Sequence, residues 1–405
     1  MRRVVSSHSG SPRTPWLHRA AFAAVGRTGD SSAVRVFGFK ARGPMTIARR
    51  VVTGLMAVLA LCAFGAAAAS ADSLYISDGV DNTITTFDAR TGAFQNFIGP
   101  PPTGVSGPRG VIHLSNGNLL VAYQNPGGST PGEIDRFATN GTFRGSLVPS
   151  TDAHPPFAPR GIILGPDNRT LYVADFGKGN VGAIETYDVE TGKFLGKLNF
   201  DKWANSSTSN REFHPNGVVF GPDGRLYISL FSEKDFQHLG WIISYDIGTG
   251  TVRLIAQYNP SATDCTPYLS RPFGLTFGAD RNLYVVGRQP SDSTNDTDKL
   301  LAFKPTATGP WACASIAGQR WIDLDQPGQP PTYARSLLFG PGGYLYLPMT
   351  GSGGDAGAVR QYNLTTGQYT DFVPPFTSPS GGLADWWWMT FGYTNPTTLA
   401  YQPAS

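Results

Sequence analysis

From residue 72 onward, short apolar runs recur between turns rich in Gly, Pro, Asp and Asn. The clearest unit covers residues 159–192, PRGIILGPDNRTLYVADFGKGNVGAIETYDVETG. Short apolar runs bounded by turn residues are typical of buried β-strands, and these turn residues tolerate the backbone angles of tight hairpins. The unit therefore predicts a Pro-x-Gly entry, three short strands and a closing Thr-Gly turn, which is most of one four-stranded antiparallel blade.

This unit has six recognisable copies, separated by 51 to 62 residues. The aligned entry positions are Gly110, Gly161, Gly217, Gly274, Ser336 and Trp388. A repeat of about 50 residues that contains four short strands is the signature of a β-propeller. We therefore predict an all-β fold, a six-bladed β-propeller with four-stranded antiparallel blades.

The two ends of this region are out of phase with the repeat. Residues 74–78 read as a second strand without a first, and residues 386–391 read as a first strand without successors. The N-terminal strands can join the C-terminal strand in one blade, which closes the ring and removes exposed sheet edges. Residues 398–401 resemble another second strand, so a partial seventh blade is the alternative.

The first 71 residues differ from the rest in composition. Arg49 and Arg50 precede the apolar run 51–69, and Ala69-Ser70-Ala71 has the small-x-small pattern of a signal-peptidase site. We predict a signal peptide over residues 45–71, an unstructured or misannotated extension over residues 1–44, and a propeller domain over residues 72–405. An uncleaved membrane anchor is the alternative, because the apolar run approaches the length that spans a bilayer.

Charge and cysteine content follow from this division. The leader holds ten of the 32 basic residues and one of the 29 acidic residues, so the propeller region carries a net charge of −6. This argues against a nucleic-acid partner. Cys265 and Cys313 are the two cysteines of that region, and an oxidising compartment outside the cytoplasm favours a disulfide between them, worth about 4 kcal/mol on the chain-entropy model. Two free buried thiols are the alternative.

The sequence PRGIILGPDNRTLYVAD followed by IETYDVETGKF resembles the repeats of NHL propellers. The segment FHPNG at residues 213–217 also resembles the Pro-Asn-Gly segment of gluconolactonase-like propellers, in which the asparagine is a metal ligand. That resemblance implies a ligand role for Asn216 alone, because the family's Asp-Gly entry is Phe273-Gly274 here and no Glu-Gly-Pro precedes the first blade. The likeness to streptogramin-lyase-type propellers is at the level of the repeat.

One position of the repeat is the most informative for function. It follows the entry proline, or its equivalent, on the face of the ring where loops precede first strands and follow second strands. We call this face the mouth. The six residues at this position are Arg109, Arg160, Asn216, Phe273, Arg335 and Trp387. Three arginines suggest an anion held by forked, charge-assisted hydrogen bonds, between apolar walls formed by Phe273 and Trp387. Structural ion pairs are the alternative, above all between Arg160 and Asp175 of the same blade.

A metal-assisted enzyme is the second hypothesis. His214, His238 and Asn216 fall in or beside mouth loops with carboxylates nearby in sequence, and such groups can bind a divalent metal or transfer a proton. Their spacing matches no compact metal motif, so catalytic residues stay unassigned.

These patterns leave three functional hypotheses. The first is an exported protein, secreted or periplasmic, that binds a small or peptidic and anionic ligand at the mouth as a monomer without stable membrane insertion. The others are a metal-assisted lyase or lactone hydrolase, and a protein-interaction scaffold.

The leader generates a direct prediction. Protein recovered after export should begin at Asp72, because cleavage is expected after Ala71. N-terminal sequencing or peptide mapping checks this, and recovery of peptides from residues 1–44 would contradict a translation start at Met45.

Overall fold

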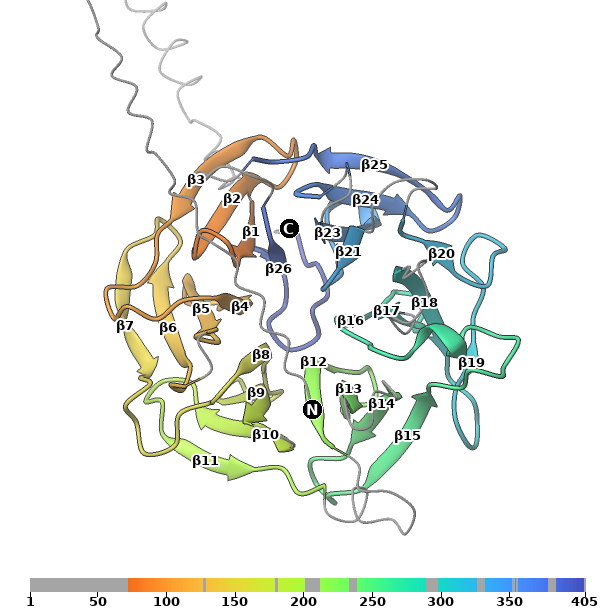
Figure 1. Ribbon diagram of the computed structural model, residues 1–405, viewed down its shortest axis with the longest axis horizontal. Coiled ribbons are helices and arrows are strands. Elements are labelled where there is room, and N and C mark those ends of the chain that lie inside the picture. Colours follow the sequence, from red (N-terminus) through yellow and green to blue (C-terminus); the bar gives the residue numbers. More distant parts are fainter. Residues whose placement is uncertain are drawn as a thin grey trace, which may run out of the picture. The chain divides into compact units, whose positions relative to one another are not determined.

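The computed structural model describes residues 72–126, 129–178, 181–200, 212–232, 239–288, 298–325, 332–351, 354, 356–377 and 384–403. The predicted leader, residues 1–71, lies outside these described residues. Six antiparallel sheets form a ring, as Figure 1 shows, so the six-bladed β-propeller is confirmed. Within the described residues, no helix is long and apolar enough to cross a bilayer.

We number the blades in chain order from the first complete one. Blade 1 consists of β4 (Pro108–His113), β5 (Asn118–Tyr123), β6 (Glu133–Ala138) and β7 (Phe143–Val148). Blade 2 consists of β8 (Pro159–Leu164), β9 (Thr170–Lys178), β10 (Val181–Asp188) and β11 (Phe194–Lys197). Blade 3 consists of β12 (His214–Phe220), β13 (Leu226–Ser232), β14 (Leu239–Tyr245) and β15 (Val252–Gln257).

Blades 4 and 5 depart from the regular pattern. Blade 4 consists of β16 (Leu275–Phe277), β17 (Leu283–Arg288), β18 (Asp298–Lys304), β19 (Ala312–Cys313) and β20 (Ile322–Asp323), and the short helix η2 (Thr266–Tyr268) precedes it. In blade 5 the first strand is split into β21 (Thr332–Ala334) and β22 (Leu338–Phe339), which both pair with β23 (Leu345–Gly351). The short helix η3 (Pro341–Gly343), β24 (Val359–Asn363) and β25 (Gln368–Val373) complete this blade.

The two ends of the domain complete blade 6. β26 (Trp386–Phe391) pairs with β1 (Ser73–Asp78), and β2 (Thr83–Asp88) and β3 (Phe94–Ile98) follow. The register places Leu74 opposite Phe391 and Asp78 opposite Trp386. The predicted closure is therefore confirmed.

The C-terminal tail does not start a seventh blade. Residues 398–401 lie beneath the ring, where Leu164 and Phe220 donate backbone N–H groups to the carbonyls of Pro396 and Thr397 at 2.8 and 3.2 Å. Figure 1 shows the tail crossing the centre of the ring. Leu164 and Phe220 are the last residues of first strands, so the tail lies at the channel end opposite the mouth. Leu399 lines a channel cavity of only about 20 Å³, together with apolar side chains of several first strands. The tail therefore closes the channel.

The inner wall of the ring is built from close backbone contacts at the entry glycines. A Cβ atom on Gly110 would lie 2.3 Å from the carbonyl oxygen of Arg160, and one on Gly161 would lie 2.7 Å from that of Asn216. The same contact recurs between Gly217 and Phe273. The strand register shifts at these Pro-x-Gly segments, for example between Pro108 and Val111. Glycine is needed there because the next blade occupies the space of a side chain.

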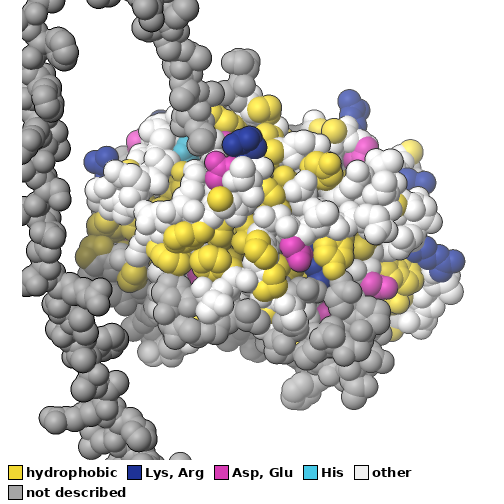
Figure 2. Space-filling model, turned by 90° about the horizontal axis from the view of Figure 1, so that it is seen from above, with side chains coloured by type: hydrophobic (Ala, Val, Ile, Leu, Met, Phe, Trp, Pro, Cys, Tyr) yellow, Lys and Arg dark blue, Asp and Glu magenta, His cyan; other side chains and the backbone are white. Residues whose placement is uncertain are grey.

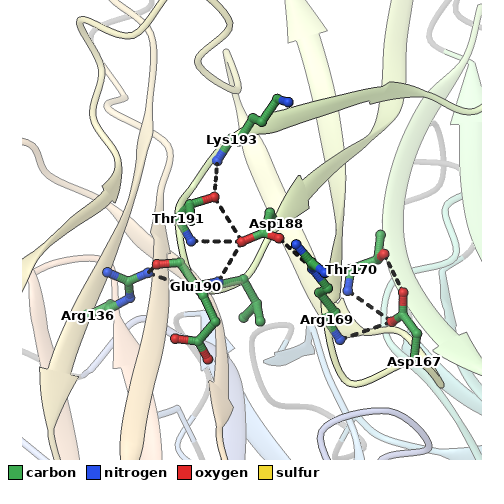
Figure 3. Close-up of polar contacts among 9 residues, drawn as sticks. Arg136, Asp167, Arg169, Thr170, Asp188, Glu190, Thr191 and Lys193 are labelled. Atoms are coloured by element: carbon green, nitrogen blue, oxygen red, sulfur yellow. Dashed lines mark hydrogen bonds and ion pairs between the residues drawn. The ribbon is translucent and has the colours of Figure 1, made fainter.

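The turn between the third and fourth strands of blade 2 is held by the side chain of Asp188. In blade 2, Oδ1 of Asp188 accepts hydrogen bonds from the backbone N–H and the hydroxyl of Thr191 at 2.9 and 2.8 Å (Figure 3). Arg169 donates to the other carboxylate oxygen at 2.8 Å, and these contacts lower the pKa of Asp188. The guanidinium of Arg136 in blade 1 reaches the carbonyl oxygens of Val189 and Glu190, so the turn also fastens one blade to the next.

Aromatic side chains pack at the seam between blades 5 and 6. The rings of Phe94 and Phe97 lie 4.7 Å apart, and Phe376 lies 5.6 Å from Phe94. Phe94 is 46% exposed, and hydrophobic side chains gather on the outer wall of the ring in Figure 2. A disulfide between Cys265 and Cys313 joins the segment before blade 4 to β19, so the predicted disulfide is confirmed.

The turn of blade 2 leads to a stability prediction. Gly192 has φ +74°, and a Cβ atom there would lie 1.8 Å from the carbonyl oxygen of Leu147 in blade 1. Gly192→Ala should therefore lower the free energy of unfolding by more than about 3 kcal/mol, since it adds a backbone clash to the left-handed strain. Urea denaturation measures this loss.

Gly224→Ala is the matched control. Gly224 has φ +75°, but no atom lies within 4 Å of a Cβ there, so this variant should lose only the strain of about 1–2 kcal/mol. Equal losses in the two variants would contradict the blade contact.

Candidate functional site

The mouth of the ring brings three predicted arginines to one indole. The guanidinium carbons of Arg109 and Arg335 lie 3.7 and 3.9 Å from the ring centre of Trp387, and that of Arg160 lies 4.9 Å from it. Arg109 and Arg335 come from blades 1 and 5, which flank blade 6 on either side. We call Arg109, Arg160, Arg335 and Trp387 the arginine cluster. Each cation–π contact of this kind contributes about 0.5–2 kcal/mol.

Arg109 is held mainly by neutral groups. It is 6% exposed, and its Nε and Nη1 donate hydrogen bonds to Oε1 of Gln124 and to the carbonyl oxygen of Pro108 at 2.9 and 3.0 Å. Burial lowers the pKa of Arg109, an effect that attraction to Asp385 opposes and repulsion from Arg335 reinforces. The positive charge of Arg109 is therefore incompletely compensated.

Arg335 lies in the break between β21 and β22. Its guanidinium lies over Phe273 at 5.4 Å, and its buried Nε has no hydrogen-bond partner among the described residues. The ion pairs found in the described residues do not include Arg109 or Arg335. Burial lowers the pKa of Arg335 as well, although Asp385 and Asp298 attract its charge. Two buried guanidinium groups thus share one indole, and no carboxylate of the described residues is in ion-pair contact with either.

Asp385 orients the indole. Its Oδ2 accepts a hydrogen bond from Nε1 of Trp387 at 2.8 Å, and its Oδ1 accepts one from the hydroxyl of Thr350 at 2.7 Å. The backbone N–H of Asp385 donates to Oδ1 of Asp78, and its carbonyl accepts from Gly79, so both termini of the domain meet here. Asp385 was not among the residues predicted from the sequence, although its position just before the strand of Trp387 places it at the mouth.

The other predicted mouth residues make separate contacts. Asn216 is 1% exposed, and its Nδ2 donates to the carbonyl oxygen of Pro272 at 3.2 Å, so the amide is turned toward blade 4. Phe273 is 8% exposed and forms an apolar wall beneath Arg335. Arg160 lies over the ring of Phe176 at 5.0 Å. The carboxylate of Asp175, the partner considered for Arg160, accepts hydrogen bonds from the backbone N–H groups of Phe157, Ala158 and Gly177.

The candidate metal ligands are only partly described. His214 is 3% exposed, its Nδ1 lies 2.8 Å from the carbonyl oxygen of Phe176, and its Nε2 lies 3.6 Å from Oε2 of Glu212. His238 lies outside the described residues. Within the part of the chain that is described, no three His, Cys, Asp or Glu side chains come together as a metal-binding group. The metal prediction for Asn216, His214 and His238 stays a prediction.

A second hollow lies on the opposite face, and no sequence pattern indicated it. It has a volume of about 620 Å³ and is lined by the tail and by the turns of blades 3, 4 and 5. Its apolar wall includes Phe220, Phe277 and Phe339, which occupy equivalent positions at the ends of three first strands.

Neither the protein-family models nor the curated proteins contain a match to this sequence. Solved structures with a similar chain path include TolB of Acinetobacter baumannii, with a TM-score of 0.49 and 15% identity over 80% of this chain and 67% of TolB. The periplasmic gluconolactonase PpgL of Pseudomonas aeruginosa matches with a TM-score of 0.48 and 17% identity over 76% of this chain and 87% of PpgL.

A gluconolactonase of Xanthomonas campestris matches with a TM-score of 0.43 and 15% identity, over 66% of this chain and 75% of its own. At such identities the likeness concerns the fold alone.

The geometry around Asp385 leads to a prediction about Gly79. A Cβ atom on Gly79 would lie 2.8 Å from Oδ2 of Asp385, 2.9 Å from Nε1 of Trp387 and 3.1 Å from Nη1 of Arg109. Gly79→Ala should therefore displace the indole, change the near-ultraviolet circular dichroism and cost about 1–3 kcal/mol of stability. Gly99→Ala is the control, because no atom lies within 4 Å of a Cβ there. An unchanged spectrum for Gly79→Ala would contradict the described packing.

Proposed function

We propose that this protein is an exported binding protein whose channel mouth holds a small or peptidic anion. One observation carries the proposal: Arg109 and Arg335 are stacked on Trp387 without an ion-pair partner among the described residues. Forked guanidinium groups match carboxylate and phosphate oxygens. A bound anion would compensate the positive charges of Arg109 and Arg335, which are buried and repel each other.

The surrounding residues support an anion more than a cation or a neutral ligand. Asp385 is the acid whose charge acts on both Arg109 and Arg335, and its two oxygens already accept hydrogen bonds from Trp387 and Thr350. Phe273 and the indole of Trp387 supply apolar surface, as small-molecule sites usually combine apolar walls with a few polar groups.

Export is part of the same proposal. The Cys265–Cys313 disulfide fits an oxidising compartment, and the arginine pair followed by an apolar run fits a signal peptide. A single propeller domain that acts as a monomer is the simplest form consistent with the closed ring.

A metal-assisted lactone hydrolase or lyase is the alternative, and a protein-interaction scaffold is the third hypothesis. The gluconolactonases among the structural neighbours make a lactone the first substrate to assay. Turnover of glucono-1,5-lactone that a chelator abolishes would favour the enzyme over the binding protein.

Binding measurements test the proposal. Isothermal titration calorimetry with citrate, succinate, inorganic phosphate and an acetylated tripeptide with a free C-terminal carboxylate should find at least one ligand. Arg109→Ala and Arg335→Ala should each weaken its affinity by about tenfold or more, because a hydrogen bond to a charged group contributes about 1.5–3 kcal/mol.

Arg225→Ala is the matched control, since Arg225 pairs with Asp246 at 3.1 Å outside the cluster. The Arg225→Ala variant should bind the anion with the same affinity as the unaltered protein. Folded Arg109→Ala and Arg335→Ala proteins with undiminished affinity would refute the proposal.

A further inference from the structure

A pair of carboxylates is buried between blades 1 and 6. Glu133 and Asp135 lie on β6 and are 1% and 0% exposed. Tyr123, at the end of β5, pairs directly with Glu133 across the strands and is 0% exposed. Tyr123 belongs to the apolar cluster that joins blade 1 to Tyr75, Ile84 and Ile98 of blade 6.

Of these three groups, Asp135 and Tyr123 lack the partners that burial demands. Glu133 accepts hydrogen bonds from the hydroxyl of Thr103 at 2.5 Å and from the backbone N–H of Ser150 at 3.3 Å. Both carboxylate oxygens of Asp135 and the hydroxyl of Tyr123 are buried without a hydrogen-bond partner in the described part of the chain. None of the ion pairs found there includes Glu133 or Asp135.

Blade 2 shows how the chain neutralises the same position when it supplies its own cation. Glu185 on β10 lies opposite Lys197 on β11, and Nζ of Lys197 contacts Oε1 of Glu185 at 2.8 Å. In blade 1 the matching pair across the strands is Asp135 and Ser146. Blade 1 therefore has a carboxylate at the same position, Asp135, but the hydroxyl of Ser146 stands where blade 2 has the ammonium group of Lys197.

Electrostatics makes this arrangement costly without a positive charge. Buried carboxylates in proteins are paired with cations or coordinate metals, because removing an uncompensated charge from water costs several kcal/mol.

The donor set indicates which cation fits. All the available donors are oxygens: two carboxylates and the hydroxyls of Tyr123, Thr103 and Ser146. Hard cations prefer oxygen ligands, and calcium accepts six to eight of them in irregular geometry, whereas magnesium demands a near-ideal octahedron.

We propose that Glu133 and Asp135 bind a calcium ion in the interface between blades 1 and 6. Thr103 lies in the connection from β3 to β4, so the ion fastens the closing blade to its neighbour. This site is independent of ligand binding at the mouth, and its test uses no mouth ligand.

The experiment compares calcium responses of the full propeller. After treatment with a chelator and its removal, calcium should bind at about one ion per protein in isothermal titration calorimetry. At calcium a hundredfold above the dissociation constant, the melting temperature should rise by about 3 °C or more. Asp135→Asn should abolish both effects.

A second variant tests whether Asp135 binds calcium or only supports the fold. Ser146→Lys places an ammonium group opposite Asp135, as Lys197 stands opposite Glu185 in blade 2. This variant should melt, without calcium, near the temperature of the calcium-loaded protein, and should show no calcium response. Lys197→Met is the control, because it alters blade 2 and should leave the calcium response unchanged.

Two results would overturn the proposal. One is a folded, unaltered protein that neither binds calcium nor melts at a higher temperature with it, which would mean that the acid pair shares a proton instead. The other is an Asp135→Asn protein that responds to calcium as strongly as the unaltered one.

Discussion

The contact between the backbones of successive blades at the entry glycines is the constraint on which this propeller depends. Gly110, Gly161 and Gly217 each abut the carbonyl oxygen of the neighbouring blade's mouth residue. Side chains at these positions would force blades apart and open the ring. The same contact determines where Arg109, Arg160 and Arg335 sit, so the packing of the scaffold and the geometry of the arginine cluster have one cause.

Most of the fold could be predicted because its signals are local. Residues 386–391 were expected to be a first strand from the repeat of apolar runs and turn residues, and β26 has these bounds. The Thr-Gly turn works through an aspartate side chain only three residues away. Closure could also be predicted, since an unpaired second strand at one end and an unpaired first strand at the other complement each other.

The site could be predicted only in part, because its geometry depends on contacts between distant segments. The repeat alignment grouped Arg109, Arg335 and Trp387, but stacking of two guanidiniums on the indole depends on Asp385 and Thr350, which share no repeat position with them. Asn216 follows the same alignment, yet its amide turns to the carbonyl of Pro272. The tail at residues 398–401 has strand-like composition, but it forms an isolated bridge between Thr394 and Tyr401 and packs under the ring instead.

The closed lower end of the channel affects how any mouth ligand would exchange. Leu399 and the first-strand side chains around it leave a cavity of about 20 Å³, which is smaller than the volume of a small organic molecule. A ligand at the arginine cluster would then enter and leave by one opening, and a second molecule could not displace it from behind. One ligand would have to leave before the next could bind. The residence time of the bound ligand would therefore limit how fast the site can bind another.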